Sequence, residues 1–208
     1  MRLYLVRHGA AQGQQGRIVG HADPPLSPEG SVMVEQLVAS MDEPPARVVG
    51  SDLARARASA GLFADRWGIE PKSDPRLREM DFGEWENRTW QELEQHDGAR
   101  LDAWMRDWVR VPAPGGESFT DLMARVRGWL DDRSEATDEL DSTVVVAHAG
   151  SIRAILCVLL AVPMEEAFGF EVDYARVTGV SVLNGTAELI CSNAERWPAA
   201  LTSGSTGS

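Results

Sequence analysis

The sequence predicts an α/β fold: a three-layer sandwich with a mostly parallel sheet and a helical insertion forming a lid over the site. Short apolar runs alternate with amphipathic segments, as in proteins whose parallel strands are joined by helices. A long helical stretch, from about 75 to 140, separates two expected strands and has the length of a subdomain. We expect one domain over residues 1–198 and a flexible tail at 199–208.

The N-terminal part alternates strand and helix twice. "RLYLV" (2–6) is short and mostly apolar, as a buried parallel strand is, and "ARVVGSDL" (46–53) is a second such run that ends in a turn. An amphipathic helix is expected over 25–41, after a Ser-Pro start. Another is expected over 54–68, where Gly68 stops it.

The insertion is expected to hold most of the remaining helices. In order, it contains a segment that starts extended and becomes helical (75–95), a helix (100–110), a loop (111–118) and a helix (119–136). Four tryptophans fall within residues 85–108, namely Trp85, Trp90, Trp104 and Trp108. Packing in the core of the insertion is the default interpretation, and an aromatic wall for a ring-bearing substrate is the alternative.

The C-terminal part contains the clearest buried strand of the chain. "STVVVAHAG" (142–150) is that strand, and an apolar helix over 151–162 follows it and ends at Pro163. The segment 178–193 is expected to be a β-hairpin around Asn184-Gly185, because this dipeptide favours tight hairpin turns.

Composition restricts the class of protein. The chain has 208 residues, 43% hydrophobic and 25% charged, with a net charge of −12, so we expect neither nucleic acid nor an anionic membrane as a partner. It has neither a membrane-length apolar run nor a signal-peptide pattern at its N-terminus, and we expect it in the cytoplasm. Cys157 and Cys191 lie in apolar surroundings, are expected to be buried thiols, and form no zinc-binding pattern.

Three expected strands end in polar residues. Arg7 and His8 follow the first strand, Arg55 lies one turn after the second, and His148 follows "TVVVA". Ligands of open α/β sheets bind outside the carboxyl ends of the strands, so these side chains should converge if the strands are parallel neighbours. Glu79, in "LREMDFGEWE", follows a short extended segment and is a fifth candidate.

This set of side chains suits phosphoryl transfer. Arg7 and Arg55 can hold a phosphate by forked, charge-assisted hydrogen bonds, and His148 adds another donor. A neutral His8 can attack phosphorus, and Glu79 can protonate the leaving oxygen and then deprotonate water. Arginines stabilise the phosphate charge, and the sequence shows no metal-ligand cluster, so we expect neither a metal nor a cofactor.

The same residues carry a family resemblance. The motifs are "LVRHG", "SDLARA", "LREMDFGEWE", "PGGES" and "VVVAHAGSIRAIL", and they cover most of residues 2–160. In this order they resemble the motifs of the histidine phosphatase, or phosphoglycerate mutase-like, superfamily. The resemblance implies a phosphoglycerate mutase-like fold and a small phosphorylated metabolite as substrate. It also implies that His8 is the phosphorylated nucleophile, Glu79 the proton donor, and Arg7, Arg55 and His148 the phosphate pocket.

A looser resemblance concerns the subfamily. The stretches 20–30, 77–90, 101–104 and 112–118 are similar to α-ribazole phosphatase of cobalamin synthesis, which implies α-ribazole 5′-phosphate as substrate. Related phosphatases of sugar phosphates share much of this pattern.

The chain also departs from the family. Ala10-Ala11 stands where the family usually has Glu-Thr, which leaves substrate preference and turnover open. Gln14 stands where many members have an asparagine that touches the phosphate, and its amide can still donate. His21 lies in the loop after the first strand, where it either contacts substrate or is a surface histidine.

Several alternatives stay open at this level. Glu79 could form a surface ion pair with the neighbouring Arg76 or Arg78 instead of acting in catalysis. A mutase would use the same site chemistry while guarding the phosphoenzyme from water, and a non-catalytic phospho-ligand binder would keep the pocket alone. The sequence also leaves the oligomeric state open, a homodimer included.

Overall fold

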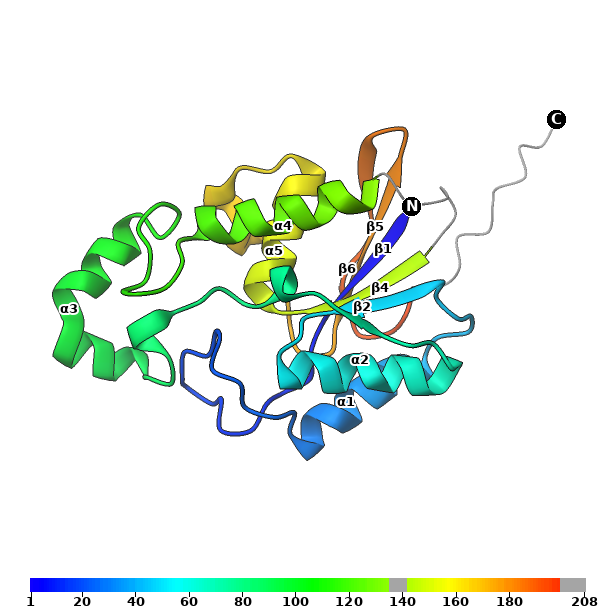
Figure 1. The fold of residues 1–208 in the computed structure, drawn as a ribbon, viewed down its shortest axis with the longest axis horizontal. Helices are drawn as coiled ribbons and strands as arrows, with labels where there is room; N and C mark the ends of the chain where they lie inside the picture. The colour runs from blue at the N-terminus through cyan, green and yellow to red at the C-terminus, as the bar shows by residue number, and fades with distance from the viewer. Residues whose placement is uncertain (135–141, 199–208) are drawn as a thin grey trace.

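The computed structural model describes residues 1–134 and 142–198, and its centre is one six-stranded sheet (Figure 1). The strands are β1 (Arg2–Arg7), β2 (Arg47–Gly50), β3 (Lys72–Ser73), β4 (Ser142–Ala147), β5 (Val177–Leu183) and β6 (Thr186–Ala194). Their order across the sheet is β3-β2-β4-β1-β5-β6. The first four are parallel, and β5 and β6 are added antiparallel. The expected α/β fold with a mostly parallel sheet is confirmed.

Helices cover both faces of this sheet. Helices α1 (Pro28–Ala39) and α2 (Ala54–Trp67) lie on one face, and α4 (Phe119–Ser134) and α5 (Ala149–Leu160) on the other (Figure 1). Two clusters of buried hydrophobic residues result, and β4 contributes side chains to both. Val144 and Val146 face α1 and α2, whereas Val145 and Ala147 face α4 and α5. This alternation is the two-residue period of a strand buried on both sides.

The insertion differs in detail from the sequence expectation. Two 3₁₀ turns, η1 (Pro75–Leu77) and η2 (Gly83–Trp85), precede α3 (Trp90–Arg106). Asp97 (φ −145°) has a non-helical backbone and divides α3 into two helical segments, as the two expected helices were divided. The Asp97 carboxylate accepts hydrogen bonds from the Trp85 indole at 2.7 Å and the Arg100 guanidinium at 2.6 Å. Residues 107–110, expected to be helical, lie beyond its end.

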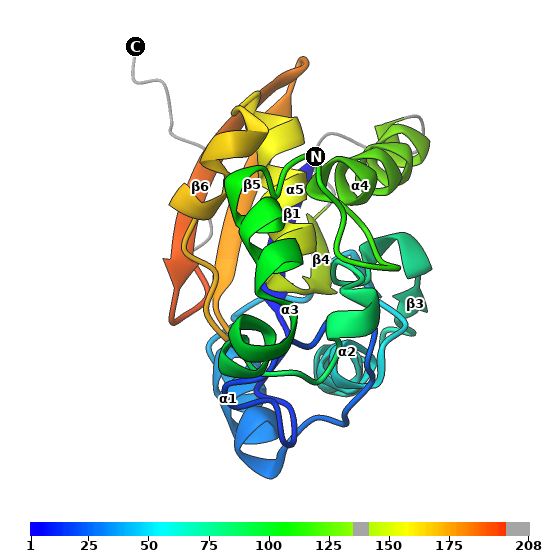
Figure 2. The ribbon, with the colours of Figure 1, turned by 90° about the vertical axis from the view of Figure 1, so that its left-hand side faces the viewer.

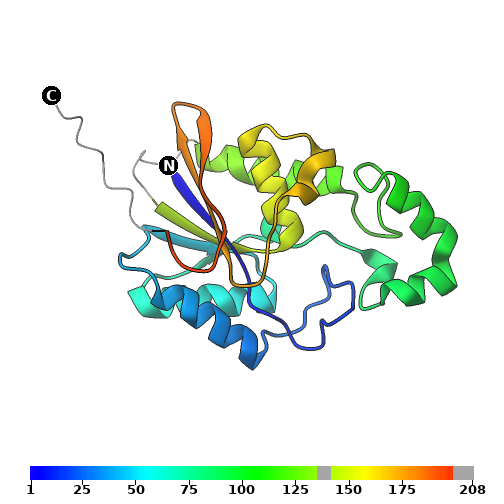
Figure 3. The same cartoon turned by 180° about the vertical axis from the view of Figure 1, so that it is seen from behind.

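The parts of the insertion take different places. Helix α4 packs beside α5 and belongs to the layer on the sheet. Helix α3 lies beyond the carboxyl ends of β1, β2 and β4, and Figure 2, viewed from that side, shows it in front of the sheet. Figure 3 shows the loop after β1 running between α1 and α3. Movement of α3 as a lid stays a prediction.

The tryptophans of the insertion serve mainly as core. Trp85 and Trp104 are buried, and their rings meet edge to face with centroids 5.9 Å apart. Trp108 packs edge-on against Phe119 at 5.0 Å, and Trp90 is 44% exposed. The default interpretation therefore holds for the two buried indoles.

The remaining elements were expected in part. The hairpin β5–β6 turns at Asn184-Gly185, both with positive φ (51° and 77°), as expected. Strand β3 and the 3₁₀ turn η3 (Met164–Gly169) were not expected, because both are too short to show a period. Both cysteines are free thiols, but only Cys157 is buried, since the edge strand leaves Cys191 partly exposed. Among the described residues, no helix is long and apolar enough to cross a membrane. The predicted tail at 199–208 lies outside the described residues.

Candidate active site

The site lies where β2, β4 and β1 end side by side. Residue pairing aligns Gly50 with Val146 and Arg7 with Ala147, so the residues that follow these strands emerge at one edge of the sheet. The expected convergence of three polar strand ends required these strands to be parallel neighbours. Strands β1 and β2 both pair with β4 in parallel, so this condition is met.

His8 is held as a neutral imidazole. Its side chain is buried, and Nδ1 lies 2.6 Å from the Gly9 carbonyl oxygen, which only accepts hydrogen bonds. Nδ1 must therefore carry the proton, which leaves the lone pair on Nε2. Burial, followed by the charge of Arg55, lowers the pKa of His8 well below 6.5. A nucleophilic nitrogen is thus available at neutral pH.

Arg55 supplies a fixed positive charge next to that nitrogen. It is fully buried in the first turn of α2, and its Nη atoms donate to the carbonyls of Ala22 at 2.8 Å and Gly20 at 2.7 Å. Its Nε lies 3.3 Å from His8 Nε2, a long hydrogen bond that a phosphate oxygen can replace. Burial lowers the pKa of Arg55 and the charge of Glu79 raises it, but a guanidinium stays charged in proteins.

His148 and Arg7, together with Arg55, form the wall around His8. The rings of His148 and His8 lie 4.8 Å apart, and burial, followed by the charges of His8 and Arg55, lowers the pKa of His148 well below 6.5. Arg7 donates to the Val172 carbonyl at 2.7 Å and stacks 3.7 Å from the centroid of the Tyr174 ring.

Some polar atoms of this wall have no partner within the described part of the chain. They are both ring nitrogens of His148 and Nε of Arg7, all buried. An unsatisfied buried polar group costs about 1–3 kcal/mol, so such groups are usually kept for a function. A small anion would satisfy the Arg7 donor and one on His148.

Glu79 approaches from the insertion. Its carboxylate accepts from the backbone N–H of Gly150, at 2.9 and 3.1 Å, and from that of Met80 at 2.9 Å. Gly150 lies in the first turn of α5, two residues after His148. A Cβ on Gly150 would lie 2.2 Å from Glu79 Oε1, so only glycine permits this approach.

The two arginines beside Glu79 have other partners. Arg78 forms a bidentate ion pair with Asp52, at 2.6 and 2.7 Å, and Arg76 pairs with Asp74 at 2.8 Å. The alternative that Glu79 is the ion-pair partner of these arginines is not what the structure shows.

The two remaining candidates from the sequence, His21 and Gln14, lie in different surroundings. His21 Nε2 lies 3.0 Å from the Glu79 carbonyl oxygen, so this histidine packs against the backbone of the candidate proton donor. Gln14 lines a groove of about 800 Å³ together with Ala10, Ala11 and Tyr174. The ring of Tyr174 is 5.6 Å from that of His8, which links the groove to the site.

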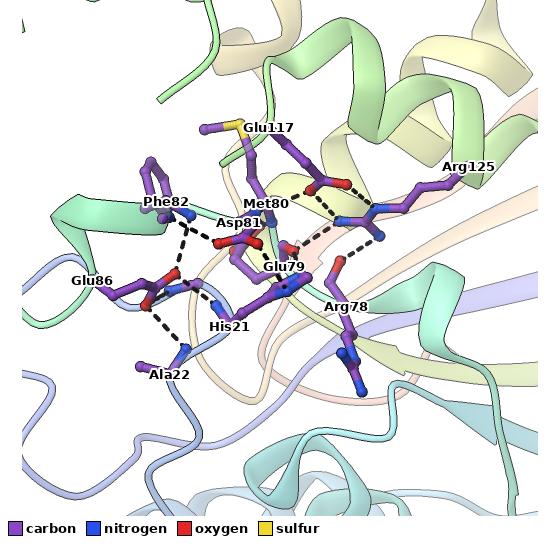
Figure 4. A network of polar contacts seen from close by, with 12 residues as sticks. His21, Ala22, Arg78, Glu79, Met80, Asp81, Phe82, Glu86, Glu117 and Arg125 are labelled. Carbon is purple, nitrogen blue, oxygen red and sulfur yellow. Dashed lines mark hydrogen bonds and ion pairs between the residues drawn. The ribbon is translucent and has the colours of Figure 1, made fainter. Parts of the chain in front are cut away.

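Glu86 is a site residue that sequence reasoning missed. Figure 4 shows its carboxylate facing a ring of backbone amides. At 2.8–3.0 Å it accepts from the N–H groups of Gly20, His21, Ala22 and Phe82. It thereby fixes the loop whose carbonyls hold Arg55. Three of these partners are at least 64 residues away, and no local pattern could have indicated them.

Tyr174, Glu117 and Arg125 were also missed. Glu117 lies in the "PGGES" motif, which was the one available signal, and it pairs with Arg125 of α4 at 2.8 Å. No group of three or more His, Cys, Asp or Glu that could hold a metal ion occurs among residues 1–134 and 142–198. The site thus offers a neutral imidazole, fixed guanidinium groups and a carboxyl group.

Comparison with known proteins identifies the family. The model of the histidine phosphatase superfamily (branch 1) matches residues 3–195. The chain belongs to this superfamily. It is a histidine phosphatase, in the class of phosphoric monoester hydrolases.

Three relatives show how similar this histidine phosphatase is to characterised proteins. It is 31% identical to the adenosylcobalamin/α-ribazole phosphatase of Salmonella typhimurium, over 91% of this chain and 94% of that protein. It is 37% identical to a glucosyl-3-phosphoglycerate phosphatase of Mycobacterium tuberculosis, over 78% of this chain and 77% of that protein. The crystal structure of the α-ribazole phosphatase from Shigella flexneri superposes with a TM-score of 0.88 at 30% identity, covering 94% of this chain and 98% of that one.

Proposed function

We propose that this phosphatase hydrolyses a small phosphorylated metabolite through a phosphohistidine formed on His8. The observation that supports this most directly is the Nδ1 hydrogen bond to the Gly9 carbonyl, which leaves the Nε2 lone pair beside Arg55. Arg7, Arg55 and His148 would hold the phosphate oxygens, and the unpartnered buried nitrogens of Arg7 and His148 suit an anion.

In the first step, His8 Nε2 attacks phosphorus. The N–P bond forms while the P–O bond to the leaving group breaks, and the leaving oxygen takes a proton from the carboxylic acid of Glu79. Arg7 and Arg55 stabilise the negative charge on the other phosphate oxygens.

In the second step, water releases the phosphate. The Glu79 carboxylate takes a proton from water, whose oxygen attacks phosphorus as the N–P bond breaks. Inorganic phosphate leaves, and both His8 and Glu79 return to their starting protonation states. The mechanism balances without a metal or a cofactor.

Replacement of the nucleophile tests this proposal. We expect His8→Ala to lower turnover of p-nitrophenyl phosphate by about 10³-fold or more, because both steps pass through Nε2. Wild-type protein quenched during turnover should carry an acid-labile phosphoryl group on His8. His96→Ala, a change at an exposed histidine of α3, is the control and should leave turnover intact. Unchanged turnover in His8→Ala would refute the proposal.

For the substrate, we propose α-ribazole 5′-phosphate. The support is the similarity to relatives named α-ribazole phosphatase, together with the groove beside Tyr174, which has room for a ring-bearing leaving group. A panel of phosphorylated metabolites, compared by kcat/KM, tests this choice. Preference for a sugar phosphate or for glucosyl-3-phosphoglycerate would refute it, and an isomer rather than free phosphate from 3-phosphoglycerate would indicate a mutase.

A further inference from the structure

Arg125 and Glu117 form a bidentate ion pair beside the backbone of residues 76–81, the segment that contains Glu79 (Figure 4). Arg125 Nε donates to Glu117 Oε1 at 2.8 Å, and Nη2 donates to Oε2 at 2.9 Å. The two side chains are only 17% and 21% exposed. Burial raises the pKa of Glu117, but the hydrogen bonds from Arg125, the charge of Arg125 and the hydrogen bond from the Asp81 N–H together lower it by more. The pair is therefore fully charged at neutral pH.

Every remaining donor of this guanidinium is used on one stretch of backbone. Nη1 donates to the carbonyls of Arg76 at 2.7 Å and Arg78 at 2.8 Å, and Nη2 donates to the carbonyl of Glu79 at 2.7 Å. With the two bonds to Glu117, these are the five N–H donors that an arginine has. No lysine, with three donors on one nitrogen, can reproduce the set.

Glu117 extends the same arrangement by one residue. Its Oε2 also accepts from the backbone N–H of Asp81 at 3.0 Å. The pair thus contacts the backbone on both sides of Glu79. Beyond the short turn η1, residues 78–82 belong to no helix or strand, so these side-chain contacts replace the hydrogen bonds that regular structure would supply.

We propose that Arg125 and Glu117 are positioning residues that set the Glu79 carboxyl group for proton transfer. The inference rests on the function proposed above, because it assigns Glu79 the proton. The pair fixes the backbone of Glu79, and the carboxylate then reaches Gly150 N–H at 2.9 Å beside His148. Neither Arg125 nor Glu117 touches the reacting atoms.

Substrates whose leaving groups differ in basicity can distinguish two roles of Arg125: positioning Glu79 for proton transfer, or general support of the fold. An alkyl phosphate needs a proton on its departing oxygen, whereas p-nitrophenyl phosphate releases a weakly basic phenolate without one. We expect Arg125→Lys to lower kcat/KM for the alkyl ester by about 10²-fold, as a displacement of roughly 1 Å does. The loss for p-nitrophenyl phosphate should be much smaller. Glu79→Gln should show the same asymmetry more strongly.

Two further variants complete the experiment. Arg127→Lys makes the same change on the exposed side of α4 and should leave both substrates unaffected. Glu117→Gln keeps the size of the side chain but loses the charge, and should reproduce the asymmetry if Arg125→Lys fails to fold. Thermal unfolding of each variant identifies such a failure.

The outcomes distinguish the two proposals. Equal losses on both substrates in a folded Arg125→Lys protein, or no loss, would overturn the positioning role. Full activity in His8→Ala would instead overturn the phosphohistidine mechanism. A crystal structure of Arg125→Lys gives a readout independent of activity: a Glu79–Gly150 contact still at 2.9 Å would also overturn the positioning role.

Discussion

At the scale of single residues, two contacts are decisive for the site: Gly9 with His8, and Gly150 with Glu79. The Gly9 carbonyl selects the His8 tautomer, because a carbonyl accepts and never donates. The missing side chain at Gly150 leaves room for the Glu79 carboxylate. Both effects act through contacts of about 3 Å or less, so one substituted atom is enough to disturb them.

A methyl group at position 150 should displace Glu79. In Gly150→Ala, the new Cβ would lie 2.2 Å from Oε1, so the carboxylate must move away from the backbone N–H of residue 150. We expect kcat to fall by about 10²-fold. Steady-state kinetics on an alkyl phosphate measure the effect.

Gly61→Ala in α2 is the matched control, since its Cβ would meet nothing within 4 Å. It should keep full activity and raise the unfolding free energy by about 0.5–1 kcal/mol, the helix advantage of alanine. An active Gly150→Ala protein would show that the close approach of Glu79 is dispensable.

At the scale of elements, loops of the site are held by partly buried carboxylates rather than by regular structure. The Glu86 carboxylate accepts hydrogen bonds from four backbone N–H groups and thereby links residues 20–22 to Phe82. The carbonyls of this loop then receive two of the Arg55 donors. The position of Arg55, a residue of α2, thus depends on Glu86, which lies just after η2.

Removal of the Glu86 carboxylate should weaken phosphate binding. In Glu86→Ala, four N–H groups lose their acceptor and the loop no longer holds the Arg55 guanidinium in place. We expect the inhibition constant of inorganic phosphate to rise by about tenfold, the equivalent of one lost hydrogen bond to a charged group. Competitive inhibition assays measure it.

Glu84→Ala provides the control for that substitution. Glu84 is two residues away and forms an exposed ion pair with Arg100 at 3.0 Å, which contributes little. Its removal should leave phosphate inhibition unchanged. Equal effects of the two substitutions would contradict the role given to Glu86.

At the scale of the whole molecule, the site makes folding sensitive to acid. The folded chain resists protonation of His8 and His148, whose pKa values burial lowers well below 6.5. It also resists protonation of Glu117, and of Asp52, whose pKa the hydrogen bonds from Arg78 lower. The unfolded chain binds protons at these groups more readily, so acid favours unfolding.

The unfolding free energy should therefore fall as the pH falls, in two windows. The histidine contribution is complete above pH 6.5 and is lost below it, until the folded pKa values are reached. The carboxylate contribution is lost below the ordinary Glu value of 4.5. Each pH unit over which the two states differ by one proton costs about 1.4 kcal/mol.

Urea denaturation at a series of pH values tests this prediction. His148→Gln should flatten the slope between pH 6.5 and 5, because one histidine no longer contributes. The slope near pH 4 should be the same in both proteins. A stability that is constant between pH 7 and 5 in the wild type would contradict the prediction.

Sequence reasoning was strongest where local patterns carry the information. The buried strands, the helix over 54–67 and the Asn184-Gly185 turn follow from short-range periodicity and turn chemistry, and the structure has them. It was weaker in the insertion. There the 3₁₀ turns η1 and η2 take the place of the expected helical start, and α3 ends at Arg106 rather than at residue 110.

By itself, the sequence determined the order of the motifs, the α/β class and the kinds of groups available for phosphoryl transfer, because these depend on residue type and spacing. Only the tertiary structure decided which atoms meet: His8 with Arg55 across 47 positions, and Glu79 with Gly150 across 71. It alone showed Glu86, Glu117 and Arg125 holding the loops of the site. Their partners are mostly backbone N–H and C=O groups, which every residue carries, so residue identity does not indicate them.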